Sequence, residues 1–120
     1  KAVVAEVGIT NEKIGVDNNN YNITTKEIFS AVRNGHHDII KYYLSNGYYN
    51  VNECDNIHNN TLFIVACQNR CKNVIKLCIK YGANINAKNI HGNTGLHYLF
   101  SYRYYDIANY LIINKGANIN

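Results

Sequence analysis

NIHNNT, residues 56–61, is followed 33 residues later by NIHGNT, residues 89–94. Downstream of each copy a second motif also recurs, as GANIN at residues 82–86 and again at residues 116–120. Self-similarity at a period of about 33 residues is typical of arrays in which helix pairs stack side by side. The repeat therefore predicts an all-α solenoid of stacked helix-turn-helix units, an architecture that usually serves as a binding surface.

Composition narrows the function classes further. The chain has 120 residues, enough for one domain with a modest core, and its first residue is Lys1, so we expect a fragment or a processed product. The net charge is +4, but the basic residues are scattered singly, whereas nucleic-acid binding favours a clustered basic face. No apolar run approaches the ~18 residues of a membrane span. We therefore expect neither nucleic-acid nor membrane binding.

The four cysteines, which follow no known disulfide spacing, indicate a reducing compartment. We therefore predict an intracellular, cytoplasmic protein. These thiols have two possible roles. Cys67 and Cys71 are four residues apart, with Cys78 and His97 downstream, a spacing that satisfies a zinc motif only loosely. Cys also behaves as a small hydrophobe on apolar helix faces, and this second role is favoured, so no metal site is predicted.

Helix signals fall into three pairs. Thr24 and Glu27 form a capping box that begins the first helix, and Asn34-Gly35 ends it. Apolar residues at helical spacing then predict further helices at 37–45, 61–69, 72–80, 94–102 and 105–114. Residues 1–22 lie outside the repeat and are interpreted as an N-terminal leader or linker. The repeat domain is expected to span 23–120, with repeats at 24–54, 55–88 and 89–120.

Several motifs in register resemble the ankyrin repeat family over residues 24–120. The family's G-x-T-P-L-H motif corresponds to GNTGLH at residues 92–97, NGHHDII at residues 34–40 is similar to N-G-H-x-x-I-V, and GANIN is similar to G-A-D-V-N. The resemblance implies antiparallel helix pairs, with hairpin loops that project at right angles like fingers. It also implies a structural role for His97, and core positions for Cys67 and Cys78.

The chain departs from the family pattern at several positions. Proline is absent from all three motif positions, and Gly95 takes its place in the third repeat. Arg70 and Arg103 replace the glycine that the family has at the turn between helices. If these two residues are left-handed, each costs roughly 1 kcal/mol relative to glycine. We therefore expect a marginally stable domain.

No constellation of residues indicates catalysis or cofactor binding, so we predict that the protein is not an enzyme. Tyr43, Tyr98 and Tyr110 fall on repeat-core positions and are interpreted as packing residues. The resemblance instead implies partner contacts at the finger tips and on the exposed side of each repeat's first helix. Those positions are Arg33, Asn34, Cys54, Ile57, His58, Asn60, Gln68, Asn69, Lys88, Ile90, His91, Asn93, Ser101 and Tyr102.

Some of these residues have two readings. Ile57 and Ile90 would contact a partner or pack between adjacent fingers, and His58 and His91 would give pH-sensitive recognition or serve as polar loop residues. Tyr102 is an interface candidate because exposed tyrosine offers a large contact area. The predicted function is a monomeric, non-catalytic module that binds a protein partner. The alternative is a structural or regulatory segment of a longer ankyrin-repeat protein.

Overall fold

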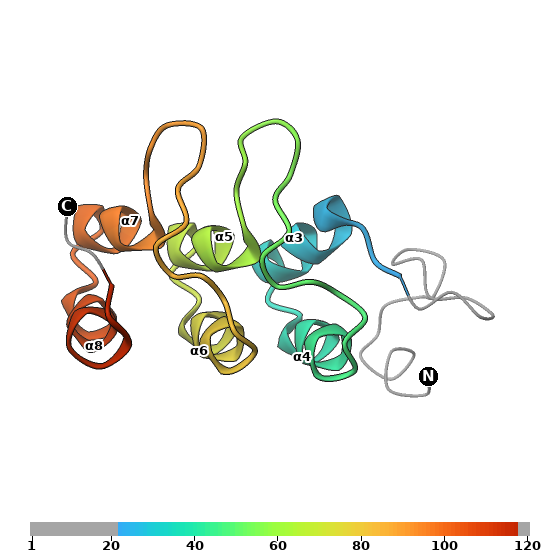
Figure 1. Cartoon of the computed structure of the whole chain (residues 1–120). Helices are drawn as coiled ribbons and strands as arrows, with labels where there is room; N and C mark the ends of the chain where they lie inside the picture. Colours follow the sequence, from blue (N-terminus) through green and yellow to red (C-terminus); the bar gives the residue numbers. More distant parts are fainter. Residues whose placement is uncertain (1–21, 118–120) are drawn as a thin grey trace.

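The computed structural model describes residues 22–117, so the predicted leader lies outside the described residues except for Asn22. Within that range the chain forms six helices in three antiparallel pairs (Figure 1). Their bounds are α3 (Thr25–Arg33), α4 (His37–Ser45), α5 (Leu62–Gln68), α6 (Lys72–Lys80), α7 (Gly95–Ser101) and α8 (Tyr105–Lys115). The predicted solenoid is confirmed, and α4 and α6 have the bounds that the sequence predicted.

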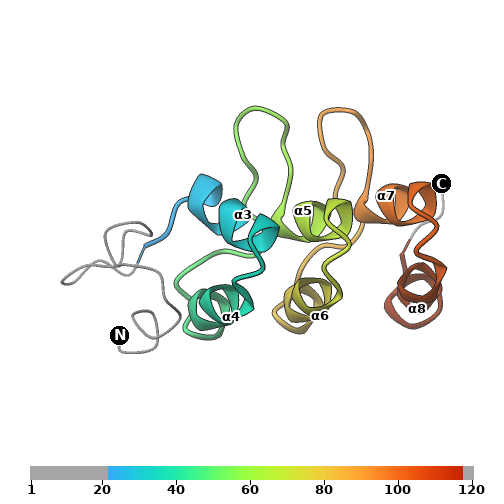
Figure 2. The same cartoon turned by 180° about the vertical axis from the view of Figure 1, so that it is seen from behind.

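The helices form two layers. The inner helices α3, α5 and α7 pack against one another in series, and the outer helices α4, α6 and α8 form the second layer (Figures 1 and 2). Two long hairpin loops project from the inner layer: the first finger, residues 48–60, and the second finger, residues 83–93. The inner helices and the fingers therefore share one side of the molecule.

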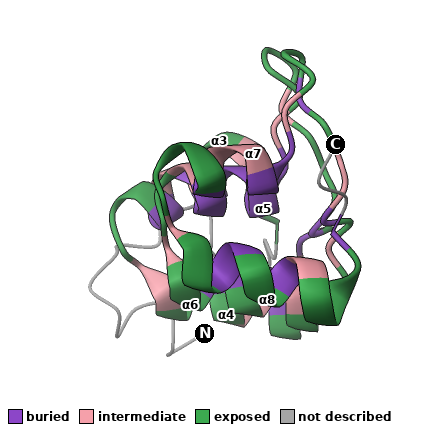
Figure 3. Cartoon of the chain, turned by 90° about the vertical axis from the view of Figure 1, so that its left-hand side faces the viewer, coloured by how far each residue is buried: buried purple, intermediate pink, exposed green. Residues whose placement is uncertain are grey.

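The core lies between the layers and between neighbouring inner helices (Figure 3). The middle helix α5 has six of its seven residues buried, Leu62–Cys67, because α3 and α7 cover it on either side. Cys67 and Cys78 have no exposed surface, which confirms their assignment to the core. Burial, with a smaller contribution from neighbouring thiols, raises the pKa of both groups well above the usual range.

One packing prediction is wrong. Tyr43 is fully buried and Tyr98 is half-buried, but 39 % of Tyr110 is exposed. Tyr110 lies on α8, which packs mainly against α7 and, within residues 22–117, has no helix pair on its outer side. The side chain therefore stays at the surface.

Threonine caps begin the inner helices. The predicted box is present at α3, where the Glu27 amide donates to Thr24 Oγ1 (3.0 Å) and the Thr24 amide donates to Glu27 Oε1 (2.9 Å). In α7 the imidazole replaces the carboxylate, because the Thr94 amide donates to His97 Nδ1 at 2.8 Å. His97 is half-buried and closes the helix start, as its structural assignment requires.

Tight packing explains the missing proline of the third repeat. Gly95 is buried at the start of α7 against α5, and a Cβ placed there would lie 2.7 Å from both Cys67 Sγ and the ring of Phe63. Real carbon contacts are longer than this, so neither alanine nor proline fits unless the Cys67 and Phe63 side chains shift. The large Phe63 ring occupies the space that a proline would need.

The two departures at the inter-helix turns carry backbone strain. Arg70 and Arg103 are left-handed, with φ of 52° and 61°, whereas the equivalent turn of the first pair has Gly35 at φ 73°. A side chain in this region costs about 1 kcal/mol or more relative to glycine. Both turns therefore carry the strain that the sequence predicted for a left-handed Arg70 and Arg103.

We expect Gly95→Ala to destabilise the domain by about 1–3 kcal/mol, the usual cost of overpacking, although alanine favours helix more than glycine does. Urea unfolding followed by circular dichroism measures this change. In a Phe63→Leu background the 2.7 Å contact with the ring Cε2 atom disappears, so the penalty of the added methyl group should shrink. An equal penalty in both backgrounds would contradict the packing explanation.

We expect Arg103→Gly to raise the free energy of unfolding by about 1 kcal/mol, because glycine relieves the left-handed strain. Arg70→Gly should gain less, since the Arg70 guanidinium also lies over the Tyr102 ring, 5.1 Å from its centroid. Thermal and urea unfolding of the two variants test the difference. The explanation fails if Arg103→Gly is neutral or destabilising.

Candidate functional site

An anchoring side chain shapes the tip of each finger. In the second finger, Asn89 Oδ1 accepts hydrogen bonds from the amides of His91 (3.0 Å) and Asn93 (3.1 Å). In the first finger, the Asp55 carboxylate accepts from the amides of Ile57 (3.1 Å), His58 (3.0 Å) and Asn60 (2.6 Å). The six-residue repeat aligns Asn89 with Asn56, not with Asp55, so the first tip contains one additional residue.

The position of Asp55 changes its titration. Burial alone would raise the pKa of this carboxyl group, but the three backbone amides and the nearby His58 ring outweigh that effect, so the pKa is lowered. The His58 Nδ1 atom lies 3.9 Å from Asp55 Oδ2, a charged pair only when the imidazole is protonated. Asp55 therefore stays ionised at neutral pH and holds the turn in place.

Hydrogen bonds join the two fingers. The Ile90 amide donates to the His58 carbonyl at 2.8 Å, and Asn89 Nδ2 donates to Asn60 Oδ1 at 3.0 Å. Lower down, Asn52 Oδ1 accepts from the Asn84 amide at 2.7 Å. These contacts tie one repeat to the next, so the fingers form one connected surface.

Tyr98 is a second anchor that the sequence did not reveal. Its hydroxyl group accepts from Asn89 Nδ2 (2.9 Å) and Asn93 Nδ2 (3.4 Å), and the Gln68 side chain also bonds to it. Burial alone would raise the pKa of this phenol, but the hydrogen bonds outweigh it and lower the pKa. Asn60, Gln68 and Asn93, all predicted to face a partner, are half-buried and their side chains hold the fingers.

The finger tips present apolar and imidazole groups to solvent. Ile57 is 72 % exposed and Ile90 is 60 % exposed, so neither is packed away between the fingers. His58 and His91 are also exposed, with ring centroids 6.4 Å apart and ring planes inclined by 31°. Four predicted partner-facing side chains thus lie together on one surface, which we call the tip patch: Ile57, His58, Ile90 and His91.

The remaining predicted residues lie along the inner helices and finger flanks. Asn34 and Asn69 are exposed helix caps whose side chains bond within their own helices, to Ser30 Oγ and the Val65 carbonyl. Ser101 and Tyr102 lie at the end of α7, where Tyr102 is 42 % exposed beside Arg70. Lys88 on the second finger is exposed.

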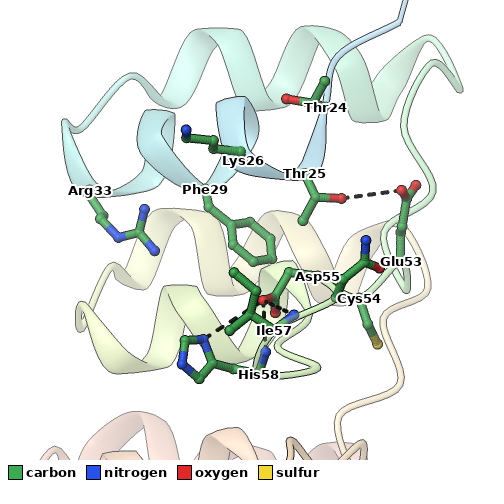
Figure 4. Close-up of a pocket in the computed structure, with 11 residues that line it drawn as sticks. Thr24, Thr25, Lys26, Phe29, Arg33, Glu53, Cys54, Asp55, Ile57 and His58 are labelled. Carbon is green, nitrogen blue, oxygen red and sulfur yellow. Dashed lines mark hydrogen bonds and ion pairs between the residues drawn. The ribbon is translucent and has the colours of Figure 1, made fainter.

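A groove of about 610 Å³ separates α3 from the first finger (Figure 4). Lys26, Phe29 and Arg33 line it from the helix, and residues 53–58 line it from the finger. The groove brings together four residues that the sequence predicted to face a partner: Arg33, Cys54, Ile57 and His58. Lys26 and Phe29 were not predicted.

The described part of the chain offers little for metal chemistry. Cys71 Sγ lies 3.2 Å from His37 Nε2, but no group of three His, Cys, Asp or Glu side chains within residues 22–117 is arranged to hold a metal ion. In the same range, no helix has the length and apolar character needed to cross a bilayer.

Comparison with known proteins adds the family. Residues 28–120 match the family model described as ankyrin repeats (3 copies). The ankyrin repeat protein OPG189 of variola virus is 38 % identical over 87 residues, which cover 71 % of this chain and 15 % of that relative. OPG189 of monkeypox virus is 38 % identical over 63 residues, covering 51 % of this chain and 11 % of that relative. The chain thus spans a small part of these relatives.

The Asp55 anchor predicts a pH-dependent stability. Because its folded pKa is lowered, Asp55 should contribute stability above its ordinary value of 3.8, and this contribution should be lost as the pH falls through the folded pKa. Asp55→Asn should therefore cost about 1–2 kcal/mol at pH 7, and the difference from wild type should narrow below pH 3.8. Urea unfolding across this pH range measures both effects. The exposed Asp106, replaced by Asn, is the control; an equal pH profile for both variants would rule out the anchor.

Proposed function

The chain belongs to the ankyrin repeat family, and on that premise we propose that it is a non-catalytic module that binds a protein partner through the finger tips and the inner helices. The family fold is a non-enzymatic, protein-interacting one. We further propose that the module acts as a monomer inside the cell, with neither a nucleic acid nor a membrane as its partner. The scattered cations and the unpaired cysteines support this proposal.

The observation that carries the proposal is the exposure of two isoleucines on a fixed surface. Ile57 and Ile90 project from tips that Asp55 and Asn89 hold with hydrogen bonds. Burying such a side chain gains about 1.5–3 kcal/mol. Because the tips are already ordered, binding would lose little of this gain to the entropy of folding a loop.

The proposed contact surface is the tip patch with Arg33, Lys88, Ser101 and Tyr102, all exposed. Asn34, Asn69 and Cys54 lie along the edges of this surface. Asn60, Gln68 and Asn93 would support it from below, through the hydrogen bonds that fix the fingers. Polar groups around a small apolar centre are typical of protein interfaces.

A specific observation favours the second candidate, a segment within a longer ankyrin array. Val32 and Cys67, at equivalent positions on α3 and α5, are 3 % and 0 % exposed because the next inner helix covers them, whereas Phe100 on α7 is 37 % exposed. The Phe100 ring lies 6.0 Å from that of Tyr105, itself 49 % exposed. This apolar outer face of α7 and α8 would suit a further stacked repeat.

Paired affinity capture from the lysate of the native host tests the interaction role. One bait is wild type, and the second carries Ile57, His58, Ile90, His91 and Tyr102 all changed to Ala. A third, matched bait carries exposed outer-helix residues changed to Ala: Lys41, Lys76 and Asn109. Wild type and the outer-helix bait should retain a partner that the five-residue variant loses, with affinity reduced by at least ~10-fold, or about 1.4 kcal/mol.

Circular dichroism must first show that all three baits have the same helical content and similar unfolding midpoints. Equal capture by the five-residue variant and wild type would reject the finger tips as the contact surface. If the outer-helix bait alone loses the partner, the interface lies on α4, α6 and α8.

A further inference from the structure

We propose that the groove between α3 and the first finger binds an acidic amphipathic helix of the protein partner, with two carboxylates spaced two turns apart and an aliphatic residue between them. The inference rests on the proposed function, because it names the chemistry of a partner at that surface. Arg33, Ile57 and His58 line the groove and also belong to the proposed contact surface.

The spacing of the α3 side chains defines the ligand. Lys26, Phe29 and Arg33 occupy positions i, i+3 and i+7 of the helix, and all three line the groove. Seven residues rise about 10 Å along a helix, so one carboxylate cannot contact both cations. A partner helix with acidic residues at i and i+7 has the same spacing and places its intervening i+3 or i+4 side chain against Ile57, which is 72 % exposed, since Phe29 lines the groove but is only 4 % exposed.

Within residues 22–117 the cations of the groove have no acidic partner. The ion-pair contact found within residues 22–117 joins His58 and Asp55, and neither Lys26 nor Arg33 contacts a carboxylate there. Asp55 is occupied by three backbone amides, and Glu53 Oε2 accepts from the Thr25 hydroxyl group at 3.2 Å. The positive charges therefore remain available to a second molecule.

Lys26 has no local stabilising role. It lies in the first turn of α3, where the helix dipole is positive, so a cation there is unfavourable. Arg33, in the last turn, has the favourable arrangement. A partner carboxylate beside Lys26 would offset the repulsion.

Charge is distributed unevenly within the groove. Arg33 and His58 lie toward one end, and Glu53 lies at the other, beside Thr25 (Figure 4), with Lys26 next to Thr25 in the first turn of α3. A nucleic-acid backbone, with a charge at every nucleotide, would meet Glu53 and Asp55 as well as the cations. Separate acidic side chains on a helix can avoid them, and a groove of about 610 Å³ suits a few side chains of a partner.

Fluorescence anisotropy with a labelled synthetic peptide tests the inference. The probe is a helix-forming peptide with Glu at i and i+7 and Leu at i+3 and i+4, titrated with the full chain at about 50 mM salt, below the ionic strength that screens charges strongly. The groove variant is Lys26→Glu with Arg33→Glu. The matched control is Lys41→Glu with Lys76→Glu, which makes the same charge change on the exposed faces of α4 and α6.

We expect the groove variant to bind the peptide at least ~10-fold more weakly than wild type, and the control to stay within about threefold. A second peptide with Lys in place of both Glu residues should prefer the groove variant over wild type. Circular dichroism of both double variants checks folding. No measurable binding of the acidic peptide to wild type, or equal losses in the two variants, overturns the inference.

Two further arms separate the possible failures. Competition by a short single-stranded DNA that the groove variant abolishes would replace the helix with a phosphate ligand and overturn the inference. In the affinity capture described above, a partner that is lost from the five-residue alanine variant but retained by the groove variant would reject the acidic helix and leave the proposed function standing.

Discussion

The stacking of α5 between α3 and α7 is the contact on which the rest of the structure depends. A helix pair of this length exposes an apolar face that it cannot cover alone, and the inner helices cover one another in series. At the centre of this contact, Cys67 and Phe63 lie so close to Gly95 that a β-carbon would not fit. The register between repeats is therefore fixed by packing, and every feature of the finger surface depends on that register.

The sequence predicted the helices well because their signals are local. Glycine breaks, threonine caps and apolar spacing act within a few residues, so α4 and α6 were found with their observed bounds. The strain at Arg70 and Arg103 followed from alignment with a glycine turn. The burial of Tyr110 was predicted wrongly because burial at a motif position depends on the neighbouring helices. The same position is covered in one repeat and exposed in another.

The candidate surface was predicted only in part, for a different physical reason. The exposed residues of the tip patch follow from a repeated motif, but the groups that hold the tips depend on contacts between segments. Asp55 takes the anchoring role in the first tip that Asn89 has in the second, and Tyr98 anchors the second finger from α7. Neither role leaves a periodic signal, since each depends on where one hydroxyl or carboxylate meets another segment in space.

The finger surface combines a backbone fixed by hydrogen bonds with exposed side chains that do not stabilise the fold. Interlocked amides hold the fingers to each other and to α7, so their order is supplied by folding and not by a ligand. On that backbone lie two exposed isoleucines, and beside it are two cations that have no acidic contact in the described chain. Exposed apolar area and a cation at the positive end of a helix both reduce the benefit of folding. Such features are stabilised when a second molecule covers them. Exposed apolar side chains also lie on α8, at Tyr105, Tyr110 and Ile113, so what supports the proposed recognition on the finger side is the combination of exposed isoleucines with fingers fixed by hydrogen bonds.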